Sequence, residues 1–187
     1  SDLAMCLADE ERVVIAGGAF GIEGAAHRGV FTAAGQTIAV LATGVDRRYP
    51  AAHSELLDRI GDSGLLVSEL PPGAMPTKDR FQARNRLMAA LSGAVVIPEA
   101  GPRSGSMRTV HNAHSLGRRV GAVPGPVTSV VSTGPNELIK QGLAAVVTQA
   151  SDVIALLDAD ASEGPSVTPS WFGIGLEAGR ESPGRSL

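Results

Sequence analysis

The sequence has little cysteine, few aromatic residues and no long apolar segment, and each shortage excludes a class of protein. Cys6 is the single cysteine among 187 residues, which rules out an internal disulfide framework and a metal site built from several cysteines. No window approaches the roughly 18 uninterrupted apolar residues of a membrane helix, and the N-terminus shows no signal-peptide pattern. We therefore expect a cytoplasmic protein without a membrane partner. Because the first residue is Ser1, we also expect a fragment or a processed chain.

The sequence also lacks an excess of basic residues: it has 16 lysine and arginine residues and 19 acidic ones, and its formal net charge is −3. The basic residues are nevertheless concentrated in one window, between residues 78 and 119. That window holds eight of them against two acids, Asp79 and Glu99, a local charge of +6. The eight are Lys78, Arg80, Arg84, Arg86, Arg103, Arg108, Arg118 and Arg119. Such a window is commonly a solvated surface, and the motifs inside it decide whether it binds an anion.

Short apolar runs alternate with segments of helical spacing along most of the chain. The runs occupy residues 12–16, 37–42, 65–68, 94–98 and 120–124 and resemble buried parallel strands. The helical segments occupy residues 24–34, 52–61, 82–91, 106–116, 136–141 and 151–157. Five glycines at helix ends are expected to form left-handed caps: Gly35, Gly61, Gly93, Gly117 and Gly142. This alternation predicts an α/β fold with an open parallel sheet and helices on both faces.

The composition changes after Asp158. Residues 160–187 are rich in Gly, Ser, Pro and Glu, apart from one apolar stretch at residues 171–174. We therefore predict one domain over residues 1–158 and a flexible tail over residues 159–187, with the apolar stretch as a docking point.

Three loops that follow predicted strands are candidates for function, because ligands of open parallel sheets bind outside the carboxyl ends of the strands. The first loop, residues 16–24, contains Gly17 and Gly21 and leads into a helix. Glycine lets the backbone approach an anion, and the helix N-terminus adds partial positive charge. The spacing differs from the dinucleotide fingerprint G-x-G-x-x-G, so the loop is either an anion site or a tight turn.

The second candidate, residues 81–86, is expected to open a helix. Arg84 and Arg86 flank Asn85 there. Guanidinium groups bind phosphate in bidentate fashion and stack on bases, and an amide can read a base edge. The alternative is an exposed helix start with ion pairs to Glu69 or Asp79.

The third candidate, residues 101–106, follows the predicted strand at 94–98. Ser104 or Ser106 can cap the next helix, Gly105 leaves its amides open, and Arg103 stands beside them. Either this is a plain serine cap or it is another anion cradle. Three such loops at one sheet edge favour a polyanionic ligand.

The sequence offers little for catalysis. Its four histidines (His27, His53, His111 and His114) lack metal-ligand grouping, and no G-x-S-x-G nucleophile turn occurs. Glu23 and Glu99 follow strand ends, but no spacing pairs them as acid and base. We therefore expect no enzyme, no catalytic residue, no metal and no cofactor.

Seven ordered blocks give the chain a specific resemblance to the DprA/Smf family over about residues 11–158. They are residues 17–29 (S-G-x-A-x-G-I-D…A-A-H-R-G in the family), 43–50 (G-x-D-x-x-Y-P), 68–73 (S-E-x-P-P-G), 81–92 (F-P-x-R-N-R), 103–106, 123–125 and 136–139. The resemblance implies a Rossmann-like domain that binds single-stranded DNA in a basic pocket, forms a homodimer and hands the strand to a RecA-type recombinase in natural transformation. The DNA contacts that it implies are Gly17, Gly21, Arg84, Asn85, Arg86, Arg103, Ser104, Gly105, Ser106 and Lys140.

The chain departs from the family pattern at a few places. Family members usually have an earlier strand with a G-S-R turn, and this chain starts at the helix that would follow that strand. Glu23 replaces the family's aspartate, Gln82 replaces a proline, and Phe20 occupies a variable, often basic position. These substitutions affect the expected affinity and leave the expected fold unchanged.

Two other interpretations remain open. One is a nucleotide-binding enzyme or sensor of the related phosphoribohydrolase-like superfamily, whose loop P-G-G-x-G-T-x-x-E carries a hydrolytic glutamate. The corresponding residues 99–109 contain no glutamate after the glycine positions. The other is an interaction module that has lost DNA binding and docks a partner through the apolar tail.

Overall fold

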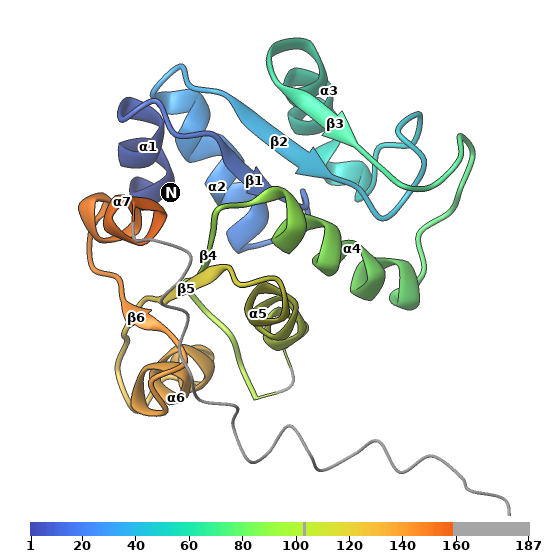
Figure 1. The fold of residues 1–187 in the computed structure, drawn as a ribbon. Coiled ribbons are helices and arrows are strands. Elements are labelled where there is room, and N and C mark those ends of the chain that lie inside the picture. The colour runs from blue at the N-terminus through green and yellow to red at the C-terminus, as the bar shows by residue number, and fades with distance from the viewer. Residues whose placement is uncertain (103, 159–187) are drawn as a thin grey trace, which may run out of the picture.

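The computed structural model describes residues 1–102 and 104–158, which form an α/β fold (Figure 1). The helices are α1 (Asp2–Asp9), α2 (Ile22–Thr32), α3 (Ser54–Ser63), α4 (Lys78–Leu91), α5 (Ser106–Ser115), α6 (Thr133–Lys140) and α7 (Ala150–Asp158), with short 3₁₀ turns at Ala51–His53 and Val130–Ser132. The strands are β1 (Val14–Ala16), β2 (Thr37–Val40), β3 (Leu65–Val67), β4 (Ala94–Ile97), β5 (Arg119–Ala122) and β6 (Ala145–Val146).

The strands form two three-stranded parallel sheets, ordered β1-β2-β3 and β4-β5-β6. The predicted parallel α/β class is thus confirmed, whereas the single continuous sheet is replaced by two, because no ladder among the described residues joins β1 to β4. In Figure 1 the strands follow one another from β3 through β2 and β1 to β4, β5 and β6. The order therefore reverses between β1 and β4. Such a switch point is where open α/β folds bind ligands.

The helices that flank the sheets also pack against one another. Helix α1 packs on α2 and contacts α7, while α4 packs along α5 and also contacts β1 and β2. The largest core cluster lies between the second sheet and its helices and includes Val95, Ile97, Val110 and Leu138. Because α4 contacts elements of both halves, it connects the first sheet to the second.

Most element boundaries differ by a few residues from those expected. The strand β6, only two residues long, was not predicted, and α1 lies where the family resemblance placed a helix. The main difference is α4, which begins at Lys78 because the Thr77 side chain accepts the amide of Arg80 and caps the helix early.

Two of the five predicted glycine caps are confirmed, since Gly117 and Gly142 have φ angles of 67° and 68°. After α2 the positive φ of 53° belongs to Ala34 and not to Gly35. Gly61 lies inside α3, and Gly93 follows Ser92 without a positive φ. The prediction is therefore wrong for these three glycines.

No helix in residues 1–102 and 104–158 is long and apolar enough to span a membrane. The predicted tail, residues 159–187, lies outside the described residues.

Candidate nucleic-acid interface

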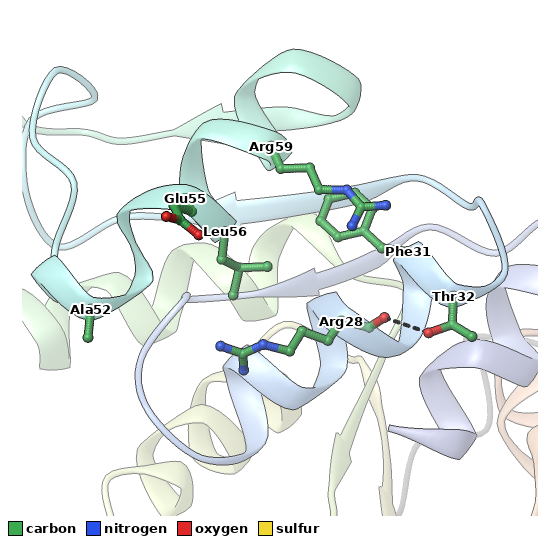
Figure 2. A pocket seen from close by; sticks show the side chains of 7 residues that line it. All are labelled: Arg28, Phe31, Thr32, Ala52, Glu55, Leu56 and Arg59. Atoms are coloured by element: carbon green, nitrogen blue, oxygen red, sulfur yellow. Dashed lines mark hydrogen bonds between the residues drawn. The ribbon is translucent and has the colours of Figure 1, made fainter.

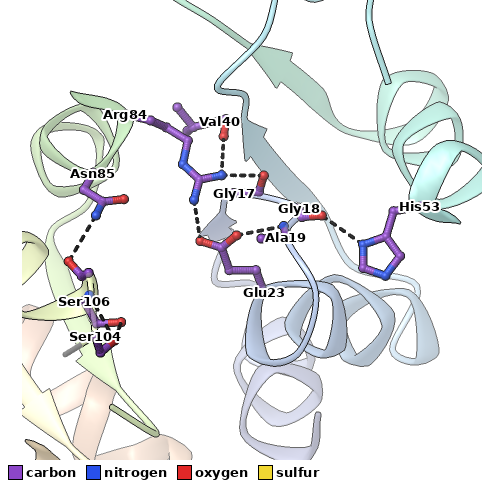
Figure 3. A network of polar contacts seen from close by, with 11 residues as sticks. Gly17, Gly18, Ala19, Glu23, Val40, His53, Arg84, Asn85, Ser104 and Ser106 are labelled. Atoms are coloured by element: carbon purple, nitrogen blue, oxygen red, sulfur yellow. Dashed lines mark hydrogen bonds and ion pairs between the residues drawn. The ribbon is translucent and has the colours of Figure 1, made fainter. Parts of the chain in front are cut away.

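Three consecutive side chains of α4 each reach a different strand-end loop. Arg84 donates to the carbonyl of Gly17, in the loop after β1. Asn85 donates to the carbonyl of Gly105, in the loop after β4 (Figure 3), and Arg86 pairs with Glu69 after β3. Because successive helix residues point about 100° apart, one helix turn can hold three separate loops. Two of the three segments that the sequence indicated, the loops after β1 and β4, are thus brought together with the loop after β3, while the third segment, residues 81–86, lies inside α4.

Arg84 is buried, with 7% of its surface exposed. Its Nη1 donates to the carbonyls of Gly17 at 2.8 Å and Val40 at 3.4 Å, and its Nη2 lies 2.8 Å from Glu23 Oε1 (Figure 3). The sequence analysis predicted that the segment with Arg84 opens a helix, and that expectation is wrong, because α4 begins at Lys78 and position 84 turns toward the interior. Both terminal nitrogens of Arg84 are engaged within the protein.

The glycine loop is held by a carboxylate of the chain itself. Glu23, in the first turn of α2, accepts the Ala19 amide on Oε2 at 2.8 Å while its Oε1 binds Arg84. A Cβ on Gly17 would lie 1.9 Å from Arg84 Nη1, so this position requires glycine for close packing. Gly21 precedes α2 with a φ of 81°, a conformation that favours glycine. A Cβ there would meet nothing within 4 Å, so the space above Gly21 is open.

The loop before α5 is joined to α4 through Asn85, whose Nδ2 lies 3.2 Å from the Gly105 carbonyl. The Ser104 hydroxyl accepts the amide of Ser106, the first residue of α5, at 3.2 Å and donates to the Ser106 hydroxyl at 3.0 Å. The serines thus order the turn themselves. Arg103, predicted to stand beside them, lies outside the described residues.

Arg86 is exposed and forms the ion pair that the sequence offered as an alternative. Its Nη2 lies 2.7 Å from both carboxylate oxygens of Glu69, and the two side chains are 59% and 44% exposed. Solvated pairs of this kind contribute little to stability and are readily exchanged for another anion.

Lys140 does not join the three loops. It is the last residue of α6, is exposed and lies 3.8 Å from Glu137. Three residues later, the Leu143 carbonyl is hydrogen-bonded to His114 in the last turn of α5. Since α5 starts at the carboxyl end of β4, its last turn marks the opposite edge of the sheet. Lys140 therefore lies near the amino ends of the strands.

Two exposed cations at the predicted edge were not named as site residues. Lys78 and Arg108 lie in the first turns of α4 and α5. Their side chains form no hydrogen bond or ion pair with the rest of the described chain. The signal that could have identified them is the basic window itself combined with a helix start, where the helix dipole adds positive potential.

Two histidines hold structure around the first sheet, His53 at the glycine loop and His27 at the amino ends of β1 and β2. His53 Nδ1 is bonded to the Gly18 carbonyl at 2.9 Å, and the His53 ring packs 4.8 Å from that of Phe20. His27 is fully buried and bonded to the Thr37 hydroxyl at 2.8 Å. Burial, and then the neighbouring charges, lower the pKa of His27 from 6.5 to about 4. Within the described ranges, no three His, Cys, Asp or Glu side chains gather as a metal site.

A separate cleft of about 390 Å³ lies between α2 and α3 (Figure 2). It is lined by Arg28, Glu55 and Arg59, and the Arg59 guanidinium lies 4.1 Å above the Phe31 ring. These residues belong to helices and not to the strand-end loops. The candidate interface is therefore the edge of joined loops, and the cleft lies beside it, since Arg28 Nη1 is also 3.1 Å from the position of a Cβ on Gly24, in the first turn of α2.

The fold and the site define a Rossmann-like α/β domain with its conspicuous loops at the topological switch point. The chain belongs to the family of DNA recombination-mediator protein A, whose model matches residues 1–158. The predicted family is thereby confirmed.

Similar proteins agree with this assignment. The chain is 51% identical over 154 residues to the putative DNA processing protein DprA of Mycobacterium tuberculosis, an alignment that covers 82% of the chain and 39% of that relative. DprA of Streptococcus pneumoniae has a similar structure, with a TM-score of 0.77, 41% identity and coverage of 82% of this chain and 54% of that one. DprA of Helicobacter pylori, described for its single-stranded DNA binding mode, gives a TM-score of 0.74 at 32% identity, with coverage of 83% and 70%. The chain spans about two fifths of the length of the M. tuberculosis relative.

Proposed function

We propose that this chain binds single-stranded DNA along the edge formed by the loops after β1, β3 and β4. The observation that carries this proposal is the attachment of all three loops to consecutive residues of α4, namely Arg84, Asn85 and Arg86. A ligand that lies across this edge meets backbone amides and hydroxyl groups of the three loops together with the exposed cations of α4 and α5. A flexible polyanion with spaced phosphates fits such a surface.

The residues of the edge divide into two groups in this proposal. Arg84 and Asn85 are positioning residues, because their polar atoms already bind the Gly17 and Gly105 carbonyls. Arg86, Lys78 and Arg108 are phosphate ligands, because each is an exposed cation at the same edge. The Ser104–Ser106 turn and the open space above Gly21 admit the sugar-phosphate backbone. Glu69 acts as a displaceable counterion that leaves Arg86 when phosphate arrives.

Phosphate contacts alone do not distinguish single strands from duplex, so the shape of the edge matters. The glycine turns and the serine turn allow the backbone of a single strand to come close to the protein. Single-strand binders combine such a path for the backbone with aromatic side chains on which the bases stack. Tyr49 and Phe81 supply such a pair at this edge, with ring centroids 6.0 Å apart. The proposal therefore includes a strong preference for single strands.

A fluorescence-anisotropy titration with single-stranded and duplex oligonucleotides of equal length, at two salt concentrations, tests the proposal. We expect single strands to bind far more tightly, with an affinity that falls as salt rises. Equal affinity for both forms, or no binding to either, contradicts it.

We further infer a homodimer that hands the strand to a RecA-type recombinase, as a binding protein and not as an enzyme. Support for self-association comes from exposed apolar side chains in the second half of the fold: Val127 after β5, Val130 in the 3₁₀ turn Val130–Ser132, and Val146 in the edge strand β6. Light scattering at several protein concentrations tests the dimer, and recombinase loading on protein-coated single strands tests the transfer.

The alternative function is a nucleotide-processing enzyme of the phosphoribohydrolase-like superfamily. The chain offers Glu23 and Glu99 at strand ends, and Glu23 is already bound to Arg84 and to the Ala19 amide. Incubation with nucleoside monophosphates therefore should release no base. A release that disappears in a Glu99→Gln variant would favour the enzyme.

A further inference from the structure

Phe20 exposes most of its ring at the tip of the glycine loop, with 65% of its surface in solvent. The chain has only six aromatic residues, four phenylalanines, one tyrosine and one tryptophan. Among the described rings Phe20 is the most exposed, ahead of Tyr49 at 46%. The loop follows β1 and leads into α2, at the same edge as Arg86 and the Ser104–Ser106 turn. An apolar ring held in water next to an anion-binding loop requires an explanation.

The ring is held firmly in this exposed position. It leans on the His53 ring at 4.8 Å, and His53 is itself buried. His53 Nδ1 is bonded to the carbonyl of Gly18, two residues before Phe20, so the loop and the support under the ring are joined. A Cβ on Gly24 would lie 2.6 Å from His53 Cε1, which shows how closely α2 packs behind the support. The Phe20 ring is thus backed on one side and open on the other.

We propose that Phe20 is a stacking platform for one nucleobase of the bound strand. This inference rests on the proposed single-stranded DNA binding and assigns a base contact to a loop that otherwise offers only backbone groups. A base that stacks on the ring removes one of its flat faces from water. Every base has such a face, so this contact does not depend on the DNA sequence. A cation lies close by, because Arg28 Nη1 is 3.1 Å from the position of a Cβ on Gly24. A phosphate next to the stacked base would lie within reach of that guanidinium.

The other explanation for Phe20 is that it merely shields His53 from water. The two explanations differ in what the DNA must contain. A shield affects the protein alone, whereas a platform requires a base. A thermodynamic cycle between the side chain and the base therefore separates them.

The experiment measures the affinity of the wild type and of Phe20→Leu for two oligonucleotides of equal length. One is oligothymidylate, and the other has the same sugar-phosphate backbone without bases. Leucine keeps an apolar cover over His53 but removes the flat ring. We expect Phe20→Leu to bind oligothymidylate about tenfold more weakly and the abasic strand equally well. Phe20→Trp should bind oligothymidylate at least as tightly as the wild type.

Leu116→Ala serves as the control, since Leu116 is an exposed apolar residue at the far end of α5 and should leave both affinities unchanged. If Phe20→Leu binds oligothymidylate like the wild type, or loses equally on both strands, the platform is refuted while the proposed function stands. If the wild type binds neither strand, the proposed function itself fails. Circular dichroism of each variant verifies that a loss of affinity comes from a folded protein.

Discussion

Gly17 and Arg84 share one space, because a Cβ on Gly17 would lie 1.9 Å from the Arg84 nitrogen that donates to the Gly17 carbonyl. The residues are 67 positions apart in sequence and belong to the loop after β1 and to α4. The same guanidinium binds Glu23, which holds the Ala19 amide. One buried cation therefore holds the glycine loop directly at Gly17 and, through Glu23, at the Ala19 amide.

Replacing Gly17 with alanine should destabilise the protein by about 2 kcal/mol, because the new methyl group overlaps the guanidinium and must displace it. Chemical denaturation measures the free energy of unfolding. Gly105→Ala is the matched control, since a Cβ there would meet only Asn85 Nδ2 at 3.8 Å, and its cost should be small. Equal losses in the two variants would show that the Gly17–Arg84 contact is not a constraint.

Lysine at position 84 should cost about 2 kcal/mol of stability, although it keeps the charge. A single ammonium group cannot bind the carbonyls of Gly17 and Val40 and the Glu23 carboxylate in the geometry of a planar guanidinium. Arg86→Lys is the comparison on the same helix, and its cost should stay below about 1 kcal/mol because the pair with Glu69 is exposed. A larger loss at position 86 would reverse the roles of the two arginines.

The salt dependence of DNA binding should separate phosphate ligands from positioning residues. Alanine at Arg86, Lys78 or Arg108 should each flatten the slope of log affinity against log salt by about 0.7. Arg84→Ala should weaken binding through the loop and change the slope much less. Arg118→Ala is the control, because Arg118 precedes β5 and contacts the Ala90 carbonyl near the end of α4. If Arg118→Ala flattens the slope more than Arg86→Ala, DNA binds the opposite edge.

The sequence predicted two of the three loops of the candidate site, those after β1 and β4, but neither the loop after β3 nor which side chains face outward. The Arg84-Asn85-Arg86 motif was visible, and so was its link to phosphate chemistry. Burial of Arg84 depended on where α4 begins, and that start was set by a Thr77 cap before a segment of weak apolar periodicity. The removal of Lys140 from the site depended on the direction of α6, which places its last residue at the opposite edge.

The alternation of strands and helices was predictable because buried parallel strands are short, apolar and closed by glycine or proline. The two-residue strand β6 was not, since Ala145 and Val146 are both exposed and give no burial pattern. The division into two sheets also has no local signal. It depends on hydrogen bonds between residues far apart in sequence, and it follows from the absence of a ladder between β1 and β4 among the described residues.

Neutralising Glu69 should tighten the binding of single strands. In the free protein Glu69 holds Arg86 with both carboxylate oxygens, so phosphate must displace it. Glu69→Gln removes that competitor and one negative charge from the edge. The affinity should rise a few-fold at low salt, and the gain should shrink at high salt because exposed charges are screened. Unchanged affinity at low salt would indicate that Arg86 does not meet phosphate.

Acid should destabilise the protein through the buried His27. In the folded chain the Thr37 hydroxyl donates to the Val14 carbonyl and therefore accepts from His27 Nδ1, while the buried Nε2 has no partner. Protonating Nε2 would bury an unpaired charge, which is why the pKa is lowered from 6.5 to about 4. The unfolded chain takes up this proton first as pH falls. The stabilisation is therefore complete above pH 6.5 and is lost between pH 6.5 and 4.

Between about pH 7.5 and 5 this linkage should remove about 2 kcal/mol of the free energy of unfolding in the wild type. His27→Asn can still donate to Thr37 but cannot titrate. Over the same pH range its free energy of unfolding should therefore fall by about 2 kcal/mol less than that of the wild type. Thr37→Val is the control, because it removes the acceptor and keeps the imidazole. It should be less stable at every pH and retain the wild-type slope. Urea unfolding at five or six pH values gives the three curves, and parallel curves for the wild type and His27→Asn would exclude His27 as the titrating group.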